Sequence, residues 1–307
     1  MHQNKGIYKL ERLFFVINPC AGYERVHKEW FKIAKLISNE NFDYNFEFTG
    51  YVGHAEEIVK GKIQEGYRKF IIVGGDGTVN EVINGIFKQK DIPTTEFYLG
   101  LFAMGSGNDW ARYYKFTQDY NESIDRIKWG QTVTQDVGKI TYYDGNKPKE
   151  VYFVNTAGLC FDAIVGRKRP KGKVSVLYSL IRSLIKYNPE FLKVYIDDDI
   201  IREDLLSISI GNGRYSASGM LQTPEAIIDD GLLDVTIYPN MSKLNVINSV
   251  IKLYKGETFN IKGLRQFRTD KIRIESIGDT FIEIEGELIE GNNFNFSVVP
   301  NSINILV

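Results

Sequence analysis

Residues 70–88 decide how the rest of the sequence is interpreted, and they read Phe70-Ile-Ile-Val-Gly-Gly-Asp-Gly-Thr-Val-Asn-Glu-Val-Ile-Asn-Gly-Ile-Phe-Lys88. The four apolar residues at the start predict a short buried strand. Gly74, Gly75 and Gly77 then predict a tight turn, because glycine alone adopts positive φ values freely. Apolar residues at helical spacing follow the turn. A strand, a glycine turn and a helix in this order present backbone N–H groups and a helix dipole to an anion, usually phosphate.

The turn does not fit two common phosphate-binding motifs. The dinucleotide fingerprint requires glycine where Asn80 stands, and a Walker A loop requires a Gly-Lys-Ser/Thr run that does not follow. Thr78 and Glu81 fit a helix capping box, which needs no ligand. Asp76, in contrast, would repel phosphate unless a metal ion or a hydrogen-bond network intervened. Its position therefore favours a Mg²⁺ ion beside the turn.

The run from Gly74 to Gly85 resembles the nucleotide loop of the diacylglycerol kinase catalytic-domain family, which includes soluble bacterial lipid kinases and the sphingosine and ceramide kinases. NAD kinases share the Gly-Gly-Asp-Gly-Thr core, whereas the continuation Asn-Glu-Val-Ile-Asn-Gly resembles the lipid kinases. The resemblance implies that this turn holds a nucleotide. The residues that it assigns here are Gly74, Gly75, Asp76, Gly77, Thr78, Asn80 and Glu81.

Bulk properties limit the classes of function. A length of 307 residues predicts two domains, and an apolar content of 43% with a net charge of −1 gives no basic excess for nucleic acid. Two cysteines, Cys20 and Cys160, cannot form a disulfide framework and suit a reducing compartment. The start has no signal-peptide core, and no run approaches the length of a membrane span. We expect a cytoplasmic protein, peripheral to the inner face of the membrane.

The first half of the chain alternates strand and helix patterns. Residues 12–18 form an uninterrupted apolar run of the kind found in parallel sheets, and residues 45–49 alternate like a second strand. By the same resemblance, Asn18 and Thr49 at the ends of these strands lie near the nucleotide. The family usually has a basic residue after Gly22, where this sequence has Tyr23 and then Glu24. Arg25, the next residue, is the candidate to replace that basic residue.

A second glycine turn follows the strand at 98–102 and reads Ala103-Met-Gly-Ser-Gly-Asn-Asp-Trp-Ala-Arg112. Ser106 and Asp109 fit a helix-capping pattern. Two such turns at the ends of neighbouring strands would converge on one crevice, where open α/β sheets bind ligands. The stretch also resembles the family's Gly-Thr/Ser-x-Asn-Asp motif. The resemblance adds Gly105, Ser106 and Asn108 to the nucleotide site and places Asp109 in a network that reaches the metal.

The pattern changes near residue 137. Strands follow one another from there, interrupted by one helix over residues 244–254, which predicts an antiparallel β-sandwich. We therefore predict an α/β nucleotide-binding domain with an open, mostly parallel sheet over residues 1–137. A β-sandwich lipid-substrate domain follows over residues 138–307, and the family resemblance implies the same order.

Asp229-Asp230-Gly231 by itself predicts a hairpin turn. The family resemblance implies that this turn binds Mg²⁺ through Asp230 and the backbone carbonyls of Ile227 and Leu232. By the same resemblance, Asp109 and Asp136 connect that ion to the nucleotide loop. Oxygen ligands suit Mg²⁺, which is a hard cation.

A last acidic stretch reads Phe281-Ile-Glu-Ile-Glu-Gly-Glu-Leu288. Strand alternation places Glu283 and Glu285 on one face, and Gly286 predicts a turn that exposes Glu287. A kinase acting on an alcohol needs a carboxylate that accepts the hydroxyl proton. The family places this base in Asp-Gly-Glu, which reads Glu285-Gly-Glu287 here. We assign the base to Glu287, with Glu285 as the substituted neighbour and Asp76 as the third catalytic residue.

Residues 167–173 carry five basic side chains before an apolar, helix-like run. They predict either a contact with anionic lipid headgroups or a solvated loop.

These patterns, together with the family resemblance, predict a lipid kinase that uses ATP and Mg²⁺ and phosphorylates a lipid hydroxyl at the membrane surface. Diacylglycerol is the default acceptor, with sphingoid bases and ceramide as alternatives. Two other functions remain open: a kinase of a soluble substrate of the NAD kinase type, and an inactive lipid- or nucleotide-binding protein, which Tyr23 and Glu285 would suit. No nucleic acid is expected, and the sequence allows a homodimer.

Overall fold

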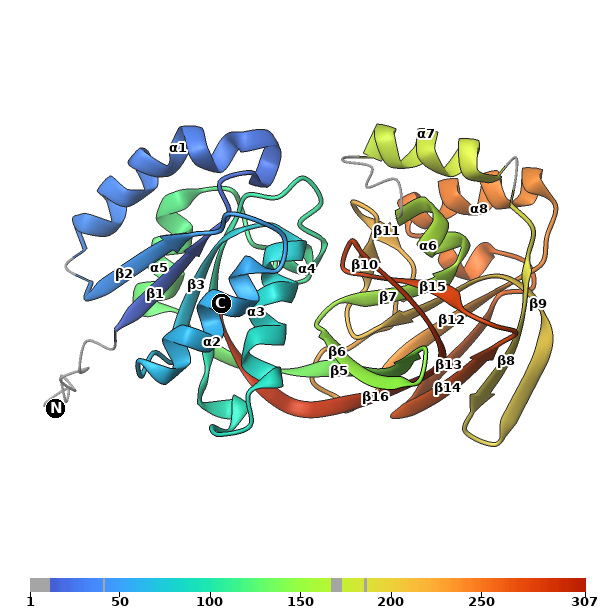
Figure 1. The fold of residues 1–307 in the computed structure, drawn as a ribbon. Coiled ribbons are helices and arrows are strands. Elements are labelled where there is room, and N and C mark those ends of the chain that lie inside the picture. The colour runs from blue at the N-terminus through green and yellow to red at the C-terminus, as the bar shows by residue number, and fades with distance from the viewer. Residues whose placement is uncertain (1–11, 41, 167–172, 185–186) are drawn as a thin grey trace, which may run out of the picture.

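In a computed structural model of the chain, the apolar residues at 70–73 lie in β3 (Lys69–Gly74), and the helix after the glycine turn is α3 (Asp76–Lys88). The structure describes residues 12–40, 42–166, 173–184 and 187–307. Two lobes lie side by side in Figure 1, the first containing the elements from β1 to α5 and the second those from β5 to β16.

Four strands of the first lobe pair in parallel, in the order β2-β1-β3-β4. Ile17 at the end of β1 is level with Val73 of β3, which is level with Phe102 of β4. The turns after these strands therefore leave the sheet at one edge. The other strands are β1 (Leu13–Ile17), β2 (Tyr44–Phe48) and β4 (Tyr98–Ala103).

Helices cover both faces of these parallel strands. Phe15 and Ile71 point to one face and pack with α1 and α5, whereas Phe14 and Phe70 point to the other face and pack with α2 and α3. This alternation follows from the two-residue period of a strand, and both faces are apolar because both are covered. The helices are α1 (Ala21–Ser38), α2 (His54–Gln64), α4 (Asp109–Tyr113) and α5 (Tyr120–Trp129), with the short 3₁₀ helix η1 (Thr94–Glu96).

The second lobe is rich in antiparallel strands around one apolar core. The long strands are β5 (Thr132–Asp144), β6 (Lys147–Phe153), β7 (Thr156–Cys160), β8 (Glu190–Ile196), β9 (Asp199–Gly211), β12 (Leu233–Pro239), β13 (Arg265–Thr269), β14 (Lys271–Ser276), β15 (Thr280–Ile284) and β16 (Glu287–Leu306). A two-strand ribbon, β10 (Tyr215–Ser216) and β11 (Met220–Leu221), stands apart. The helices are α6 (Phe161–Gly166), α7 (Lys173–Leu184) and α8 (Lys243–Lys255), with the 3₁₀ helix η2 (Thr258–Asn260). The expected helix near residue 250 is present, and α6 is an addition too short for a periodic pattern to reveal.

The 20-residue strand β16 joins the two lobes. It pairs antiparallel with β5, β14 and β15, and its last residues pair in parallel with β4, with Asn304 opposite Tyr98. Fourteen strands thus form one connected sheet. Parallel pairing is confined to five of these strands, so the expected mostly parallel sheet describes the first lobe and not the sheet as a whole. Strand β5 runs across residue 137, and the boundary there stays a prediction.

None of the helices in the described part of the chain combines the length and the apolarity that a bilayer crossing requires.

Candidate active site

The two glycine turns are in contact. A Cβ atom placed on Gly75 would lie 2.7 Å from Gly105 Cα, and one placed on Gly105 would lie 2.6 Å from Gly75 Cα. Both distances are shorter than carbon atoms tolerate, so this approach requires glycine on each side. The turns follow adjacent strands, and Met104 N donates a hydrogen bond to Gly74 O at 2.8 Å. The predicted convergence of the two turns is therefore confirmed.

Asp76 connects the two turns. Its carboxylate accepts hydrogen bonds from Asp109 N at 3.1 Å and from Trp110 N at 3.2 Å, which are the first N–H groups of α4. Burial raises the pKa of Asp76, and the N–H groups oppose that shift. The carboxylate is thus fixed in position between the two turns.

Asp109 connects the first lobe to the second. Its Oδ2 accepts a hydrogen bond from Ser218 N at 2.7 Å, next to the β10–β11 ribbon, and its Oδ1 lies 3.6 Å from Arg112 Nε. Burial, followed by the charge of Asp76, raises the pKa of Asp109 to about 7. Among the described residues, no hydrogen-bond donor reaches this buried Oδ1. Besides its ion pair with Arg112, this buried oxygen can accept a bound cation or a donor from a ligand.

Asp76 and Asp109 fit a divalent cation. A Cβ atom on Gly107 would lie 3.1 Å from Asp76 Oδ2 and 3.5 Å from Asp109 Oδ2, so both oxygens border the same small space beside this glycine. Two buried carboxylates side by side, of which Asp76 raises the pKa of Asp109, attract a cation, and oxygen donors suit Mg²⁺.

The second predicted metal position, at residues 227–232, is arranged differently. Asp230 forms an ion pair with Arg268 and accepts a hydrogen bond from Leu232 N at 3.1 Å. Asp136 accepts hydrogen bonds from Gly231 N and Asn301 N, each at 2.6 Å, so it lies beside this turn as expected. Asp109 instead lies at the contact with Ser218. Across the described residues, no group of three or more His, Cys, Asp or Glu side chains is placed to hold a metal ion, and the Asp230 site stays a prediction.

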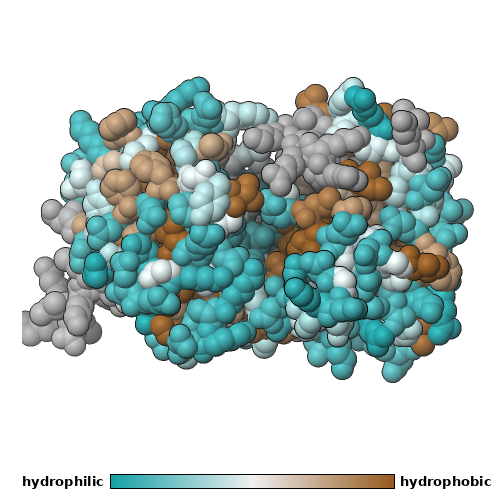
Figure 2. Space-filling view, in the orientation of Figure 1, coloured by the Kyte–Doolittle hydropathy of each residue, from teal (hydrophilic) through white to brown (hydrophobic). Residues whose placement is uncertain are grey.

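A cavity of about 370 Å³ lies between the two lobes and is lined by both glycine turns and by the β15–β16 turn. Figure 2 shows the hollow, with hydrophobic side chains gathered on the wall of the second lobe that faces the first. The predicted site residues that line it are Asn18, Gly75, Asp76, Gly77, Thr78, Glu81, Gly105, Ser106, Asp109, Glu285 and Glu287.

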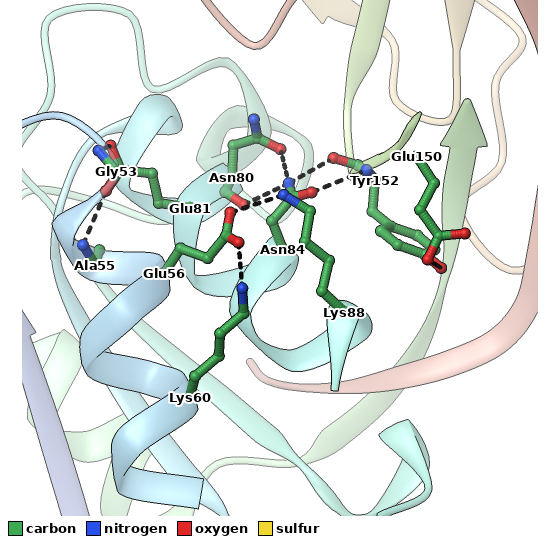
Figure 3. Close-up of polar contacts among 10 residues, drawn as sticks. All are labelled: Gly53, Ala55, Glu56, Lys60, Asn80, Glu81, Asn84, Lys88, Glu150 and Tyr152. Atoms are coloured by element: carbon green, nitrogen blue, oxygen red, sulfur yellow. Dashed lines mark hydrogen bonds and ion pairs between the residues drawn. The ribbon is translucent and has the colours of Figure 1, made fainter. Parts of the chain in front are cut away.

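The other predicted site residues lie outside the lining. Thr49 N bonds to Ile17 O at 2.8 Å, Asn108 Nδ2 bonds to Gly105 O at 3.0 Å, and Asn80 Oδ1 accepts a bond from Asn84. Asn80 thus faces the junction of α3 with β6 and not the cavity (Figure 3). The remaining predicted residues outside the lining are Gly74, Asp136, Ile227, Asp230 and Leu232.

Glu81 stabilises a helix, but not the helix that the sequence indicated. Its carboxylate accepts hydrogen bonds from Gly53 N at 2.8 Å and Ala55 N at 3.0 Å, at the start of α2 (Figure 3). Thr78 Oγ1 accepts a hydrogen bond from Asn18 Nδ2 at 3.0 Å, and no side chain caps α3. The capping-box interpretation is therefore wrong, because both side chains bond across to neighbouring segments. The start of α3 remains open toward the cavity.

Three glutamates of the β15–β16 turn line the cavity. Glu285 has a left-handed backbone, φ 53°, and its Oε1 accepts hydrogen bonds from Asn155 N at 2.6 Å and Val154 N at 3.1 Å. Burial raises the pKa of Glu285 well above its usual value and that of Glu283 to about 8. Glu285 is therefore fixed in position at the junction of the lobes. Glu287 follows it across Gly286 and reaches the same cavity.

Asp162 and Asn155 also line the cavity and were not predicted. Asp162 Oδ2 accepts hydrogen bonds from Ser209 Oγ at 2.8 Å and Gln222 Nε2 at 3.1 Å, and burial raises its pKa. Asn155 lines the cavity, and no donor in the described part of the chain bonds to its buried Oδ1. Both are single polar residues directly after apolar runs, a weak signal that could have marked them as strand-end residues.

Arg25 does not replace the missing basic residue. Its Nε donates a hydrogen bond to Glu29 Oε1 at 2.8 Å, and its Nη1 donates one to Gln118 Oε1 at 2.6 Å. The guanidinium is therefore bonded to α1 and to the segment before α5. Of the basic stretch at 167–173, residues 167–172 lie outside the described residues.

Sequence comparisons agree with this arrangement. The family profile described as diacylglycerol kinase catalytic domain matches residues 12–140, and the one described as YegS C-terminal NAD kinase beta sandwich-like domain matches residues 160–307. Putative lipid kinase YtlR of Bacillus subtilis is 25% identical and covers 95% of this chain and 98% of its own length. Lipid kinase YegS of Escherichia coli K12 is 24% identical and covers 87% of each chain.

Solved structures show the same fold. A putative diacylglycerol kinase from Bacillus anthracis superposes with a TM-score of 0.78 at 20% identity, covering 96% of this chain and 97% of its own. Yeast NADH kinase complexed with NADH superposes with a TM-score of 0.56 at 13% identity, covering 96% of this chain and 82% of its own.

Proposed function

Because this chain belongs to the diacylglycerol kinase catalytic-domain family, in which its relatives are lipid kinases, we propose that it transfers the γ-phosphoryl group of ATP to a lipid hydroxyl. We further propose diacylglycerol as the acceptor and Mg²⁺ as the cofactor. The observation that supports this most is the composition of one cavity. The two glycine turns of the first lobe and carboxylates of the second lobe line the same space.

The glycine turns are suited to the triphosphate. The helix α3 begins at the cavity without a side-chain cap, so its first N–H groups and its dipole favour an anion there. Ser106 and Thr78 add hydroxyl groups to the lining. Because Gly75 and Gly105 approach each other closely, this wall of the cavity consists mainly of backbone. A phosphate chain can approach such a surface closely.

Asp76 and Asp109 would hold the Mg²⁺ ion through carboxylate oxygens. When bound, the ion neutralises charge on the phosphate oxygens of ATP during transfer. Asp76 is oriented for this by two N–H groups of α4, and Asp109 by Ser218 N. The bond from Ser218 N to Asp109 also connects the first lobe to the second.

Glu287 accepts the proton in this proposal. The acceptor oxygen forms a bond to the γ-phosphorus, the bond from that phosphorus to the leaving oxygen of ADP breaks, and the hydroxyl proton passes to the Glu287 carboxylate. Burial favours the protonated forms of Glu283 and Glu285, whose pKa values it raises. Burial therefore lowers the negative charge that these two side chains place opposite the triphosphate.

The wall of the second lobe offers apolar contacts for the acceptor. Ala157, Leu180 and Met220 line the cavity from that side. An apolar wall opposite a polar phosphate-binding wall suits an acceptor with an acyl chain and one hydroxyl group.

The test is phosphate transfer to defined acceptors. Purified protein, Mg²⁺ and radiolabelled ATP are incubated with mixed micelles of diacylglycerol, ceramide or sphingosine, with a total lipid extract, and with NAD. Labelled phosphatidic acid is the expected product. Label on ceramide or sphingosine alone would correct the acceptor, and label on NAD alone would replace the lipid proposal. Binding of ATP and Mg²⁺ without any labelled product would identify an inactive binding protein.

A further inference from the structure

Helix α7 has apolar side chains on a buried face and on an exposed face. Leu180 and Leu184 are buried in the core of the second lobe. Val174, Tyr178 and Ile181 are spaced by four and three residues, so they share a face, and they are 84%, 64% and 39% exposed. A helix of a monomeric soluble protein normally carries polar residues on its outer face. The outer face of α7 is therefore suited to a partner.

Helix α8 also has exposed apolar side chains. Leu244 and Ile251, two turns apart, are exposed, whereas Val246, Val250 and Leu253 are buried in the core that also holds Leu180 of α7. Both helices lie along the upper edge of the second lobe in Figure 1, and hydrophobic side chains appear along that edge in Figure 2. We call the exposed residues the α7/α8 surface: Val174, Tyr178, Ile181, Leu244 and Ile251.

All the charged residues of α7 and α8 are basic. Neither helix sequence contains Asp or Glu, although the chain has 39 acidic and 38 basic residues. Their charged residues are Lys173, Arg182, Lys243, Lys252 and Lys255. Apolar side chains mixed with basic ones suit the interface of a bilayer that contains anionic lipid. A second copy of the chain, docked by the same surface, would instead bring like charges together.

The position of α7 relates this surface to the cavity. Leu180 lines the cavity between the lobes, and the next residue, Ile181, is exposed on the outer face. Helix α7 therefore forms part of the cavity wall on one side and part of the exposed surface on the other. An acyl chain that leaves a bilayer beneath this surface would have only the thickness of one helix to pass.

We propose that the α7/α8 surface docks this protein onto anionic membranes and brings the cavity next to the acceptor lipid. The biological meaning of the contact rests on the proposed function, but the contact itself is measurable without ATP. Docking places the apolar side chains at the acyl boundary and the basic side chains among the headgroups.

The experiment is sedimentation with vesicles of phosphatidylcholine and phosphatidylglycerol in equal parts. Val174→Gln with Ile181→Gln keeps good helix formers on α7 and should lower the partition coefficient about tenfold. Leu244→Gln should lower it independently.

The matched control is Ile277→Gln, because Ile277 is 83% exposed in the turn between β14 and β15, and it should change binding less than about twofold. Arg182→Gln should weaken binding about fivefold on these vesicles and leave binding to pure phosphatidylcholine unchanged.

Activity measurements separate this proposal from the proposed function. The double variant should lose transfer to diacylglycerol in vesicles and keep transfer to a short-chain diacylglycerol in solution. Vesicle binding equal to that of the native protein would overturn the docking surface. A native dimer that the double variant converts to a monomer would also overturn it, in favour of a second copy. A protein that binds vesicles through these residues but phosphorylates no lipid would contradict the kinase proposal alone.

Discussion

Asn84 and Tyr152 exchange two hydrogen bonds where α3 of the first lobe meets β6 of the second. Asn84 Nδ2 donates to Tyr152 O at 2.9 Å, and Tyr152 N donates to Asn84 Oδ1 at 3.1 Å (Figure 3). Helix α3 begins at the first glycine turn, and Tyr152 lies two residues before Val154, which helps to hold Glu285. The Asn84 amide therefore helps to hold the proposed phosphate site at a defined distance from the acidic turn.

Replacement of Asn84 should destabilise the protein strongly. Asn84→Ala removes both bonds and leaves the buried N–H and carbonyl of Tyr152 without partners, so we expect a loss of about 2–3 kcal/mol in the free energy of unfolding. Urea denaturation measures it. Asn84→Asp keeps the acceptor for Tyr152 N but buries a carboxylate against Tyr152 O and Asn80 O, so it should lose at least as much. Equal stability of Asn84→Ala and the native protein would show that the contact does not hold the lobes.

Asp76→Asn should abolish transfer while the protein stays folded. The amide keeps one acceptor for the N–H groups of α4 but removes the charge that the proposed Mg²⁺ requires. We expect kcat to fall at least about a hundredfold with a small change in the melting temperature. Phosphate transfer and circular dichroism together test this. Native-like kcat would remove Asp76 from the catalytic residues.

Glu287→Gln and Glu285→Gln should differ in effect. Glu287→Gln removes the proposed proton acceptor, so kcat should fall about a hundredfold or more with little change in KM for ATP. Glu285→Gln replaces a side chain whose protonated form is favoured because burial raises its pKa well above its usual value, and the amide oxygen can still accept the bonds from Val154 N and Asn155 N. It should keep most of the activity. The opposite ranking would move the base assignment to Glu285.

Two positions for Mg²⁺ can be distinguished by titration. Asp109→Asn removes charge beside Asp76, and the Mg²⁺ concentration for half-maximal transfer should rise about tenfold. Asp230→Asn disrupts an ion pair with Arg268 at the surface, so it should lower stability by about 0.5–1 kcal/mol and leave the Mg²⁺ dependence unchanged. A shifted Mg²⁺ dependence in Asp230→Asn would support the metal site that the family resemblance implied.

Glu283 should make stability fall with rising pH. Burial raises the pKa of Glu283 to about 8 in the folded protein, from a usual value of 4.5. The folded state thus favours the protonated form, and its contribution to stability is complete below 4.5 and lost as pH rises through about 8. Glu283→Gln cannot ionise and retains an acceptor for Gly286 N. It should be more stable than the native protein by about 1–2 kcal/mol near pH 9 and nearly equal near pH 5. Equal stability of the two proteins at both pH values would contradict the raised pKa of Glu283.

Local patterns were sufficient for the strand, turn and helix around Gly75 and for the convergence of the two glycine turns. Apolar periodicity and glycine content act within about ten residues of the chain, and level strand ends bring the turns together. The partner of Glu81 could not be found in this way, because Gly53 lies 28 residues earlier in the chain. The role of Asp162 could not be predicted for the same reason, because Ser209 and Gln222, which donate hydrogen bonds to it, follow 47 and 60 residues later.

Strand β16 has a consequence for synthesis on the ribosome. Asn304 bonds to Phe97 O from 207 residues further along the chain, so β4 has an unpaired edge while everything between them is translated. Exposed apolar strand edges recruit other strands. The nascent first lobe would therefore be the aggregation-prone species, and holdase chaperones would protect it until β16 emerges.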